Sequence, residues 1–497
     1  MLRERTRVTK IVEMDTAVDF VTDINDTFWY AVIALLIGSG LYYTVRSRFI
    51  QIRLVPDMLR SIVEKPEVQP DGTPGISAFR AFSVSAASRV GTGNIAGVAI
   101  AISLGGPGAV FWMWAMALIG AATAFLESTL AQLYKVRDED GAFRGGPAYY
   151  MQYGLRKRWM GMIFAVIITV TYGFVFNAVQ TNSIVDAVAG SVGEKTTFLQ
   201  IGVGLVVAVL VGAVIFGGIR RISAVSQVVV PVMALAYLVI GVIVVVLNID
   251  EVPTMFRLIV ENAFGLEEIV GGGFAAAFMN GIRRGLFSNE AGMGSAPNAG
   301  ATASVTHPVK QGLVQSLGVY FDTLLVCSIT AFIILLSDPE FGSGLEGATL
   351  TQNALSSQLG DWTVHFLAVL IFFLAFTSVI GNYYYSESNM EFLTGSRRIL
   401  PYLRSAVVLC VFLGAIGSVP LVWALADLAM GVMATVNLVA LVPLSGIAYA
   451  LFHNYSAQRK QGRDPVFHAG DVPGIRGIQV WNGDDVTPVG NESSGAR

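Results

Sequence analysis

The sequence predicts an all-α integral membrane protein with about eleven transmembrane helices. Of its 497 residues, 54% are hydrophobic and only 13% are charged, against roughly 25% charged residues in soluble domains. Several apolar runs reach the ~20 residues that a helix needs to cross ~30 Å of hydrocarbon. Cys327 and Cys410 lie in apolar stretches and are interpreted as small buried hydrophobic residues. No metal-ligand spacing or phosphate-binding loop is present, and we expect no cofactor.

Eleven hydrophobic segments follow one another along the chain. They are residues 28–45, 76–104, 108–134, 160–189, 199–218, 225–248, 269–302, 311–336, 362–386, 402–418 and 421–452. The second and the seventh segments are long, rich in glycine and serine, and interrupted by polar residues. A short amphipathic stretch, 54–65, predicts a helix that lies at the membrane interface.

Lysine and arginine are concentrated in alternate loops. The basic segments are 46–80, 135–158, 219–224, 387–404 and the tail after the last span. Basic loops stay in the cytoplasm, so we expect an extracellular N-terminal segment (1–27), an extra first helix (28–45), a cytoplasmic loop with the interfacial helix (46–75) and a polar cytoplasmic tail (453–497). Bases near the N-terminus disagree with this orientation, but they are far from the first span and carry little topological weight.

The two interrupted segments share a motif. "RVGTGNIAG" at 89–97 and "RGLFSNEAG" at 284–292 align their Arg, Asn, Ala and final Gly at an offset of 195 residues. An acidic residue follows each Asn at the same distance, Glu127 after Asn94 and Asp322 after Asn289. The match predicts an internal repeat, with one copy over 76–248 and the other over 269–452.

The repeat predicts a secondary transporter. Each copy holds five spans, and because five is odd, the second copy must be inverted in the membrane. Inverted repeats with paired discontinuous helices indicate a transporter binding site. Gly91 and Gly93 would unwind one helix there, and freed backbone groups are tolerated in a membrane only where a ligand or a neighbouring helix uses them. The alternative is that these glycines only allow close helix packing.

Three strings of the sequence carry a family resemblance. "GTGNIAGVAIAISLGGPGAVFWMW", "GFVFNAVQTNSI" and "RRGLFSNEAGMGSAP" resemble the alanine/glycine:cation symporter family, the sodium–alanine symporters, over roughly residues 25–455. The resemblance implies the leucine-transporter (LeuT) fold preceded by one extra helix. It also implies sodium-coupled uptake of alanine and glycine, often with tolerance of the D enantiomer, by a multi-pass protein of the cell membrane.

The same resemblance implies two ligand sets. In this fold the unwound stretch binds substrate through its amides and sodium through the carbonyls before it. Carried over, the amides of Thr92 and Gly93 would hold the substrate carboxylate, and the carbonyls of Ala87 and Val90 would face sodium. An adjacent Thr–Ser pair also ligates sodium in this fold, and here the pair in the ninth span consists of residues Thr377 and Ser378.

Other side chains are candidates for substrate contact. Asn94 has room between small neighbours, although it could instead cap the half-helix beside it. Gln180 offers an uncharged donor and acceptor to a zwitterion, with a helix–helix hydrogen bond as its alternative. The large apolar residues Met279, Ile282 and Phe287, near the second break, could close around a methyl group.

Three acids lie at membrane depth, where ionisable residues are functional candidates. For Glu127 and Asp322 we favour a structural ion-pair or gating role, with Arg89, Arg283 or Arg284 as possible partners, over direct ligation. Glu290 matches no role known for the fold. Proton coupling is an alternative in which these acids would titrate. A channel would need a polar stripe along several helices, and an enzyme would need a nucleophile–base arrangement; neither pattern is present.

Overall fold

The computed structural model describes residues 2–66, 75–138, 141–265, 273–339, 347–417 and 419–482. The last part of the predicted tail, 483–497, lies outside these residues. Each of the eleven predicted segments contains helix in the part that the structure describes. Within the described residues, eight helices are long and apolar enough to cross a membrane, and the remaining predicted spans are the two broken helices and the short helix α19.

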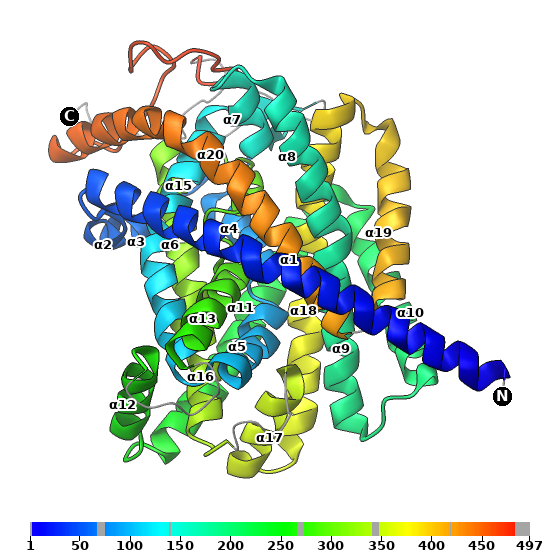
Figure 1. The fold of residues 1–497 in the computed structure, drawn as a ribbon. Coiled ribbons are helices and arrows are strands. Elements are labelled where there is room, and N and C mark those ends of the chain that lie inside the picture. Colours follow the sequence, from blue (N-terminus) through cyan, green and yellow to red (C-terminus); the bar gives the residue numbers. More distant parts are fainter. Residues whose placement is uncertain are drawn as a thin grey trace.

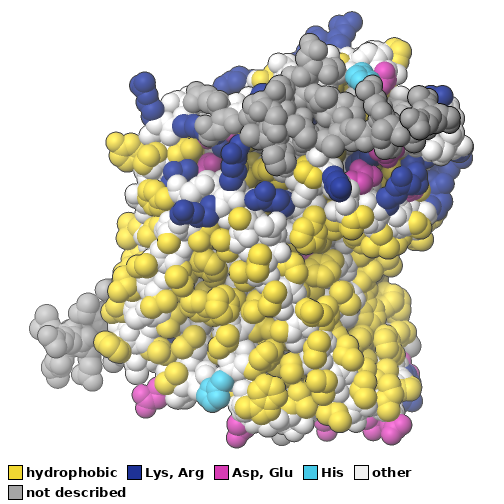
Figure 2. Space-filling view, turned by 180° about the vertical axis from the view of Figure 1, so that it is seen from behind, with side chains coloured by type: hydrophobic (Ala, Val, Ile, Leu, Met, Phe, Trp, Pro, Cys, Tyr) yellow, Lys and Arg dark blue, Asp and Glu magenta, His cyan; other side chains and the backbone are white. Residues whose placement is uncertain are grey.

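The helices form one bundle with an apolar belt (Figures 1 and 2). Figure 2 shows Lys and Arg gathered along the upper edge of this belt, and Asp and Glu along the lower edge. The upper edge, called the basic end below, carries α7, the start of α8 and the end of α20 (Figure 1). This separation of charge is the one that the loop composition predicts, and the expected orientation places the basic end in the cytoplasm.

The first half of the chain contains an extra helix and the first repeat. Helix α1 extends on the N-terminal side of the predicted first span, the amphipathic stretch 54–65 contains α3, and the short helix α2 precedes it. The elements are α1 (Leu2–Arg46), α2 (Ile50–Arg53), α3 (Val55–Ile62), α4 (Ala78–Arg89), η1 (Gly93–Gly97), α5 (Val98–Gly105), α6 (Gly108–Leu133), β1 (Val136–Arg137), β2 (Phe143–Arg144), α7 (Pro147–Tyr153), α8 (Arg158–Val170), η2 (Thr171–Val175), α9 (Phe176–Val192), α10 (Thr197–Ile215) and α11 (Gly218–Leu247). Strands β1 and β2 pair antiparallel.

The second half contains the second repeat. Its elements are α12 (Val252–Ala263), α13 (Gly273–Asn289), α14 (Ala296–Gly300), α15 (Pro308–Val319), η3 (Tyr320–Cys327), α16 (Ser328–Leu335), α17 (Gly347–Leu359), α18 (Trp362–Thr394), η4 (Arg397–Ile399), α19 (Leu400–Gly414) and α20 (Val419–Lys460). Helices α18 and α20 extend past the predicted spans, and their polar ends pair with other segments, Glu391 with Arg144 and Arg459 with Asp57.

The two broken helices run antiparallel at the centre of the bundle. Helix α5, after the first break, packs against α13, before the second break; α4, before the first break, packs against α14, after the second. At one end of this pair, Gly105 lies against the Ala276 carbonyl, so closely that a side-chain Cβ would come within 2.9 Å of it. At the other end, Ile76 and Ala303 form a parallel bridge, and the Ser304 N–H donates to the Ile76 carbonyl at 2.8 Å.

Part of the tail that the sequence analysis treats as simply polar is packed on the protein. After α20 ends at Lys460, the chain stays at the basic end, where the Phe467 N–H donates to the Thr306 carbonyl at 2.9 Å. The Trp481 side chain is buried, and its indole N–H donates to the Gln132 carbonyl at 3.2 Å. Single aromatic residues in a polar stretch make this contact, which is why composition alone did not predict it.

Candidate functional site

The first break redirects the backbone of the helix. Helix α4 ends at Arg89, and the Gly91 N–H then donates to the Asn94 side-chain oxygen at 2.9 Å rather than to the Ala87 carbonyl. The Asn94 N–H likewise bonds to the Gly91 carbonyl rather than to that of Val90. The carbonyls of Ala87 and Val90 therefore lose the donors that a continuous helix would supply. Both residues are buried.

The second break is built on left-handed backbone. Glu290, Gly292 and Gly294 have φ angles of 57°, 89° and 78°. Glycine adopts such angles readily, but a residue with a side chain is strained. The carboxylate of Glu290 is held at both oxygens, by the hydroxyl of Ser295 at 2.6 Å and that of Ser88 at 2.8 Å. Because Ser88 belongs to α4, Glu290 links the two breaks.

Each break is bound by the acid of the other repeat. Asn94, in the first break, donates to the Asp322 carboxylate at 2.6 Å. The Glu127 carboxylate accepts from the backbone N–H groups of Gly292 and Gly294, in the second break, each at 3.2 Å. All of these residues are at the centre of the bundle, and both acids are fully buried. The two acids therefore have hydrogen-bond donors as their partners, rather than the arginines considered from sequence.

The arginines of the repeated motif have other partners. Arg284 forms a buried ion pair with Asp427 of α20, and its guanidinium lies 5.0 Å from the Trp423 ring centroid. Arg89 donates to the Gln315 carbonyl at 3.3 Å. Arg283 reaches Asp26 of α1 at 3.1 Å. The motif thus positions its two equivalent arginines, Arg89 and Arg284, in different environments.

The structure places the predicted Thr–Ser pair of α18 beside the first break. Ser378 on α18 lies directly against Gly91, in the space that a Gly91 side chain would occupy. The hydroxyls of Thr377 and Ser378 donate to the Leu374 carbonyl at 2.8 and 3.0 Å. This backbone bonding is usual for such residues in membrane helices. It engages the hydroxyl hydrogens and leaves the oxygen lone pairs available.

Of the predicted substrate residues, Gln180 and Phe287 lie at the unwound stretch, whereas Met279 lies farther along α13. The side chain of Gln180 reaches the unwound stretch, where its oxygen accepts from the Thr92 N–H at 3.2 Å, and the Phe287 ring covers Gly93. Met279 and Ile282 precede Phe287 on α13 by eight and five residues. At a rise of about 1.5 Å per residue, Met279 is about 12 Å away along the helix axis. The structure does not bring Met279 to the same point as Phe287.

Aromatic rings surround Phe287. Its ring centroid is 4.9 Å from that of Phe176 and 4.9 Å from that of Trp423, and Phe176 is in turn 4.7 Å from Tyr172. These rings come from η2, α9, α13 and α20. The space next to the unwound backbone is therefore bounded by large rigid side chains.

Sequence reasoning missed several residues at the break. The hydroxyl of Ser288 donates to Asp322 at 2.7 Å, and that of Thr330 donates to the Asn94 carbonyl at 2.7 Å. Cys327 lies 3.0 Å from the Ser288 hydroxyl, so it is buried, but beside polar groups. Ser288 stands inside the repeated motif and could have been found there. Thr330 has no sequence signal, because its partner is 236 residues away.

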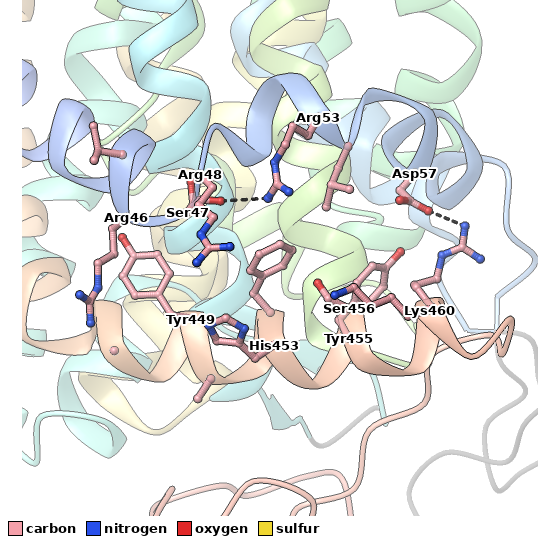
Figure 3. A pocket seen from close by; sticks show the side chains of 16 residues that line it. Arg46, Ser47, Arg48, Arg53, Asp57, Tyr449, His453, Tyr455, Ser456 and Lys460 are labelled. Carbon is pink, nitrogen blue, oxygen red and sulfur yellow. Dashed lines mark hydrogen bonds and ion pairs between the residues drawn. The ribbon is translucent and has the colours of Figure 1, made fainter.

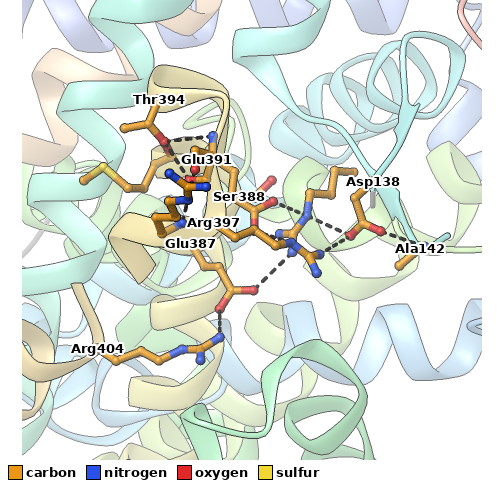
Figure 4. Close-up of polar contacts among 12 residues, drawn as sticks. Asp138, Ala142, Glu387, Ser388, Glu391, Thr394, Arg397 and Arg404 are labelled. Carbon is orange, nitrogen blue, oxygen red and sulfur yellow. Dashed lines mark hydrogen bonds and ion pairs between the residues drawn. The ribbon is translucent and has the colours of Figure 1, made fainter. Parts of the chain in front are cut away.

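A second polar cluster lies at the basic end of α18 (Figure 4). Arg144, from the β-hairpin, pairs with Asp138 at 3.0 Å, Glu387 at 3.2 Å and Glu391 at 2.6 Å. Arg397 and Arg404 pair with the same acids, reaching Glu391 at 3.1 Å and Glu387 at 3.2 Å. Burial alone would lower the pKa of Arg144, but the neighbouring Tyr384 and these carboxylates raise it. The cluster ties the helix that carries Thr377 and Ser378 to two loops of the basic end.

Comparisons with known proteins agree with this arrangement. The family model described as "Sodium:alanine symporter family" matches residues 14–469. The chain is 51% identical to "Amino-acid carrier protein AlsT" of Bacillus subtilis, covering 92% of this chain and 96% of that protein. It is 48% identical to "Probable sodium/glutamine symporter GlnT" of the same organism, over 92% and 94%. It is 38% identical to "Sodium/alanine symporter AgcS" of Methanococcus maripaludis, over 89% and 98%.

Two solved transporters share the fold. The structure of MhsT in complex with L-phenylalanine gives a TM-score of 0.51 at 13% identity, covering 78% of this chain and 90% of that one. A Na⁺-coupled sialic acid symporter gives 0.50 at 11% identity, over 89% and 93%. These similarities establish the leucine-transporter fold that the repeat and the strings of the sequence indicate.

The reciprocal binding of the acids generates a prediction about stability. Glu127→Gln replaces one carboxylate oxygen with an amide NH₂, which cannot accept from a backbone N–H and leaves a buried donor unpaired, at a cost of about 1–3 kcal/mol. Asp322→Asn makes the same change, but one carboxylate oxygen of Asp322 accepts from the hydroxyls of Ser288 and Thr323. These hydroxyls can rotate and accept hydrogen bonds from the new NH₂ group instead. We expect a larger fall in melting temperature of the purified protein for Glu127→Gln. Equal falls would contradict the reciprocal arrangement.

Proposed function

The chain belongs to the sodium:alanine symporter family, a family of secondary transporters rather than enzymes, and from this premise we propose that it couples inward sodium flow to the uptake of alanine and glycine. Membership makes it a multi-pass membrane transporter of the amino-acid symporter class. The proposal adds the substrates, the ion, the binding residues and the orientation, with the N-terminus outside and the C-terminus in the cytoplasm. Alternating access around the two breaks would move both ligands.

The observation that carries the proposal is the oxygen arrangement beside the first break. Sodium needs several oxygen ligands, because removing an ion from water is costly unless its hydration is replaced. The carbonyls of Ala87 and Val90, which have lost their helical donors, belong to the same stretch as Gly91, and Gly91 contacts Ser378. The hydroxyls of Thr377 and Ser378 have already donated their hydrogens to Leu374 and can offer only lone pairs. We infer that these four oxygens ligate the ion.

The proposed substrate site occupies the adjoining turn. The amides of Thr92 and Gly93 would bind the carboxylate. In the structure the Gln180 side chain accepts from the Thr92 N–H, so Gln180 would either share this amide with the carboxylate or release it when substrate binds. Asn94 would act mainly by shaping the turn, because its side chain joins Gly91 to Asp322. Phe287 and the rings of Phe176 and Trp423 around it favour a side chain no larger than a methyl group.

Glutamine is a second candidate substrate, since one relative is named a probable sodium/glutamine symporter at 48% identity. A glutamine side chain is longer and carries an amide that needs hydrogen-bond partners when buried. The aromatic surroundings of Phe287 offer few such partners, which favours alanine and glycine. Proton coupling is the alternative to sodium, with Glu127, Asp322 or Glu290 as the titrating groups.

Reconstituted vesicles separate these possibilities. The purified protein is placed in proteoliposomes, and alanine uptake is measured under a sodium gradient alone and under a proton gradient alone. We expect uptake with sodium only, and competition by glycine that exceeds competition by glutamine. Uptake driven by protons without sodium would contradict sodium coupling, and stronger competition by glutamine would replace the substrate assignment.

Removing a sodium oxygen should weaken the binding of both ligands. Thr377→Val keeps the shape of the side chain and removes its hydroxyl, and Ser378→Ala removes the other. Losing one ligand of a buried cation should raise the sodium concentration at half-maximal alanine binding on the order of tenfold, about 1.4 kcal/mol. Because coupling is reciprocal, alanine affinity should fall at low sodium and recover at high sodium. An unchanged sodium midpoint in both variants would leave the two hydroxyls with only their bonds to Leu374.

Two glycines of the same turn provide a matched test of the substrate site. A Cβ at Gly93 would approach Phe287 ring carbons at 2.9 and 3.1 Å, whereas a Cβ at Gly97 makes only ordinary contacts, 3.8 Å from Trp423 at the nearest. We expect Gly93→Ala to lower alanine uptake at low alanine concentration by about tenfold or more, because the added methyl group and a displaced ring obstruct approach to the backbone. Gly97→Ala should stay within about twofold of the parent. Similar uptake by the two variants would argue against the unwound-backbone site.

A further inference from the structure

A large cavity lined by several charged residues opens at the basic end, away from the breaks. It has a volume of about 940 Å³ and lies between the end of α1 with α2 and α3 on one side and the last turns of α20 on the other (Figure 3). Five of the residues that line it are lysine or arginine: Arg46, Arg48, Arg53, Arg459 and Lys460. Asp57 is the only acidic residue among its described lining residues. The cavity is therefore a concentration of positive charge.

Most of this charge is available to a ligand. Asp57 pairs with Arg459 at 2.7 Å, which accounts for the single acid. Arg53 donates to the Ser47 carbonyl at 3.2 Å, a neutral partner that leaves its charge uncompensated. Arg46 lies over the Tyr449 ring at 5.8 Å. Figure 3 shows Arg48 and Arg53 directed from the α2 side toward α20.

The chain holds these arginines in place through a fixed turn. Arg48 and Phe49 have φ angles of 56° and 57°, left-handed backbone that side chains rarely adopt without a structural reason. The turn is secured because the Phe49 N–H donates to the Thr44 carbonyl at 2.8 Å. Gln51 then bonds to the Leu118 carbonyl of α6 at 3.3 Å, and its own carbonyl accepts from the Tyr320 hydroxyl at 3.1 Å. One wall of the cavity is thus anchored to the transporter core.

Exposed apolar side chains lie on the same segments as the arginines of the cavity. Tyr42, Val45, Phe49 and Ile52 are each between 48% and 66% exposed, although they belong to the same segments as the arginines. Exposed apolar residues next to arginines are typical of the boundary between hydrocarbon and headgroups. A ligand that fits this site would have a negatively charged, hydrogen-bond-accepting group for the arginines and an apolar part for the exposed apolar side chains.

We propose that the cavity binds the phosphate headgroup of an anionic glycerophospholipid, whose acyl chains lie along the exposed apolar residues of α1 and α2. Basic pockets between transmembrane helices bind such headgroups, and arginine suits phosphate because its planar fork matches the phosphate oxygens. A neutral amino acid has no net charge to favour this place, so the cavity is a site separate from the proposed transport site. A lipid held there would brace α1 against α20.

The test compares two triple variants with equal loss of charge. The cavity variant carries Arg46→Gln, Arg48→Gln and Lys460→Gln. The control variant carries Lys157→Gln, Arg398→Gln and Arg463→Gln, three exposed bases of the same end of the molecule that do not line the cavity. A third variant, Arg46→Lys with Arg48→Lys, keeps the charge, and melting temperatures verify that each protein is folded. If the cavity variant fails to fold, Arg48→Gln alone takes its place.

Binding is measured by native mass spectrometry of the full chain in detergent, titrated with phosphatidylglycerol or phosphatidylethanolamine and with inorganic phosphate as competitor. Each removed charge is worth about fivefold in affinity, so phosphatidylglycerol affinity should fall by at least about tenfold in the cavity variant. It should change by less than about twofold in the control variant and should fall less in the lysine variant than in the cavity variant, because lysine keeps the charge but not the planar fork. Phosphatidylethanolamine, whose headgroup is zwitterionic with no net charge, should bind weakly. Equal losses in both triple variants, or no loss, would overturn the proposal. Displacement by inorganic phosphate at the same concentration as lipid would overturn the lipid source and assign a site for soluble anions.

Discussion

Unsatisfied backbone inside a membrane is the constraint on which this structure depends. Each free N–H or C=O group in hydrocarbon costs several kcal/mol, and this protein breaks two helices at the centre of its bundle. The breaks persist because each has partners fixed by other helices. Glu127 receives the amides of Gly292 and Gly294, and Gln180 receives that of Thr92. The inverted repeat supplies such partners in pairs, since the helix carrying each acid lies against the break of the opposite copy.

This constraint explains how much of the fold the sequence could predict. Spans are recognised from apolar length alone, and the repeated motif locates the breaks because glycine, serine and asparagine are otherwise poor choices for a membrane helix. The antiparallel pairing of the broken helices follows from an odd number of spans in each copy. This reasoning does not predict that Ser378 lies against Gly91. Only the family resemblance places the Thr–Ser pair beside the break, because nothing in "LAFTSVIGN" by itself identifies α4 as its neighbour.

Contacts between segments that are distant in the chain could not be predicted from the sequence. The Arg284–Asp427 pair, the Thr330 bond to Asn94 and the rings of Phe176 and Trp423 each connect elements whose proximity only the fold establishes. Glu290 is the clearest case. Its left-handed backbone and its bonds to Ser88 and Ser295 are a property of the loop after α13, and a motif containing an acid gives no sign that the acid serves to hold the loop.

The position of the proposed ligands on one turn gives coupling a physical basis. Ala87, Val90, Thr92 and Gly93 fall within seven consecutive residues, so under the proposed function both ligands bind a single piece of unwound backbone. Sodium at the carbonyls would fix the peptide planes that also carry the amides, and part of the ordering entropy of the substrate site is then already lost before the amino acid arrives. The carboxylate in turn brings negative charge to the same turn and strengthens the hold on the cation. A regular helix would abolish both sites together, which is the reason for a symporter to retain a conformation that a membrane otherwise penalises.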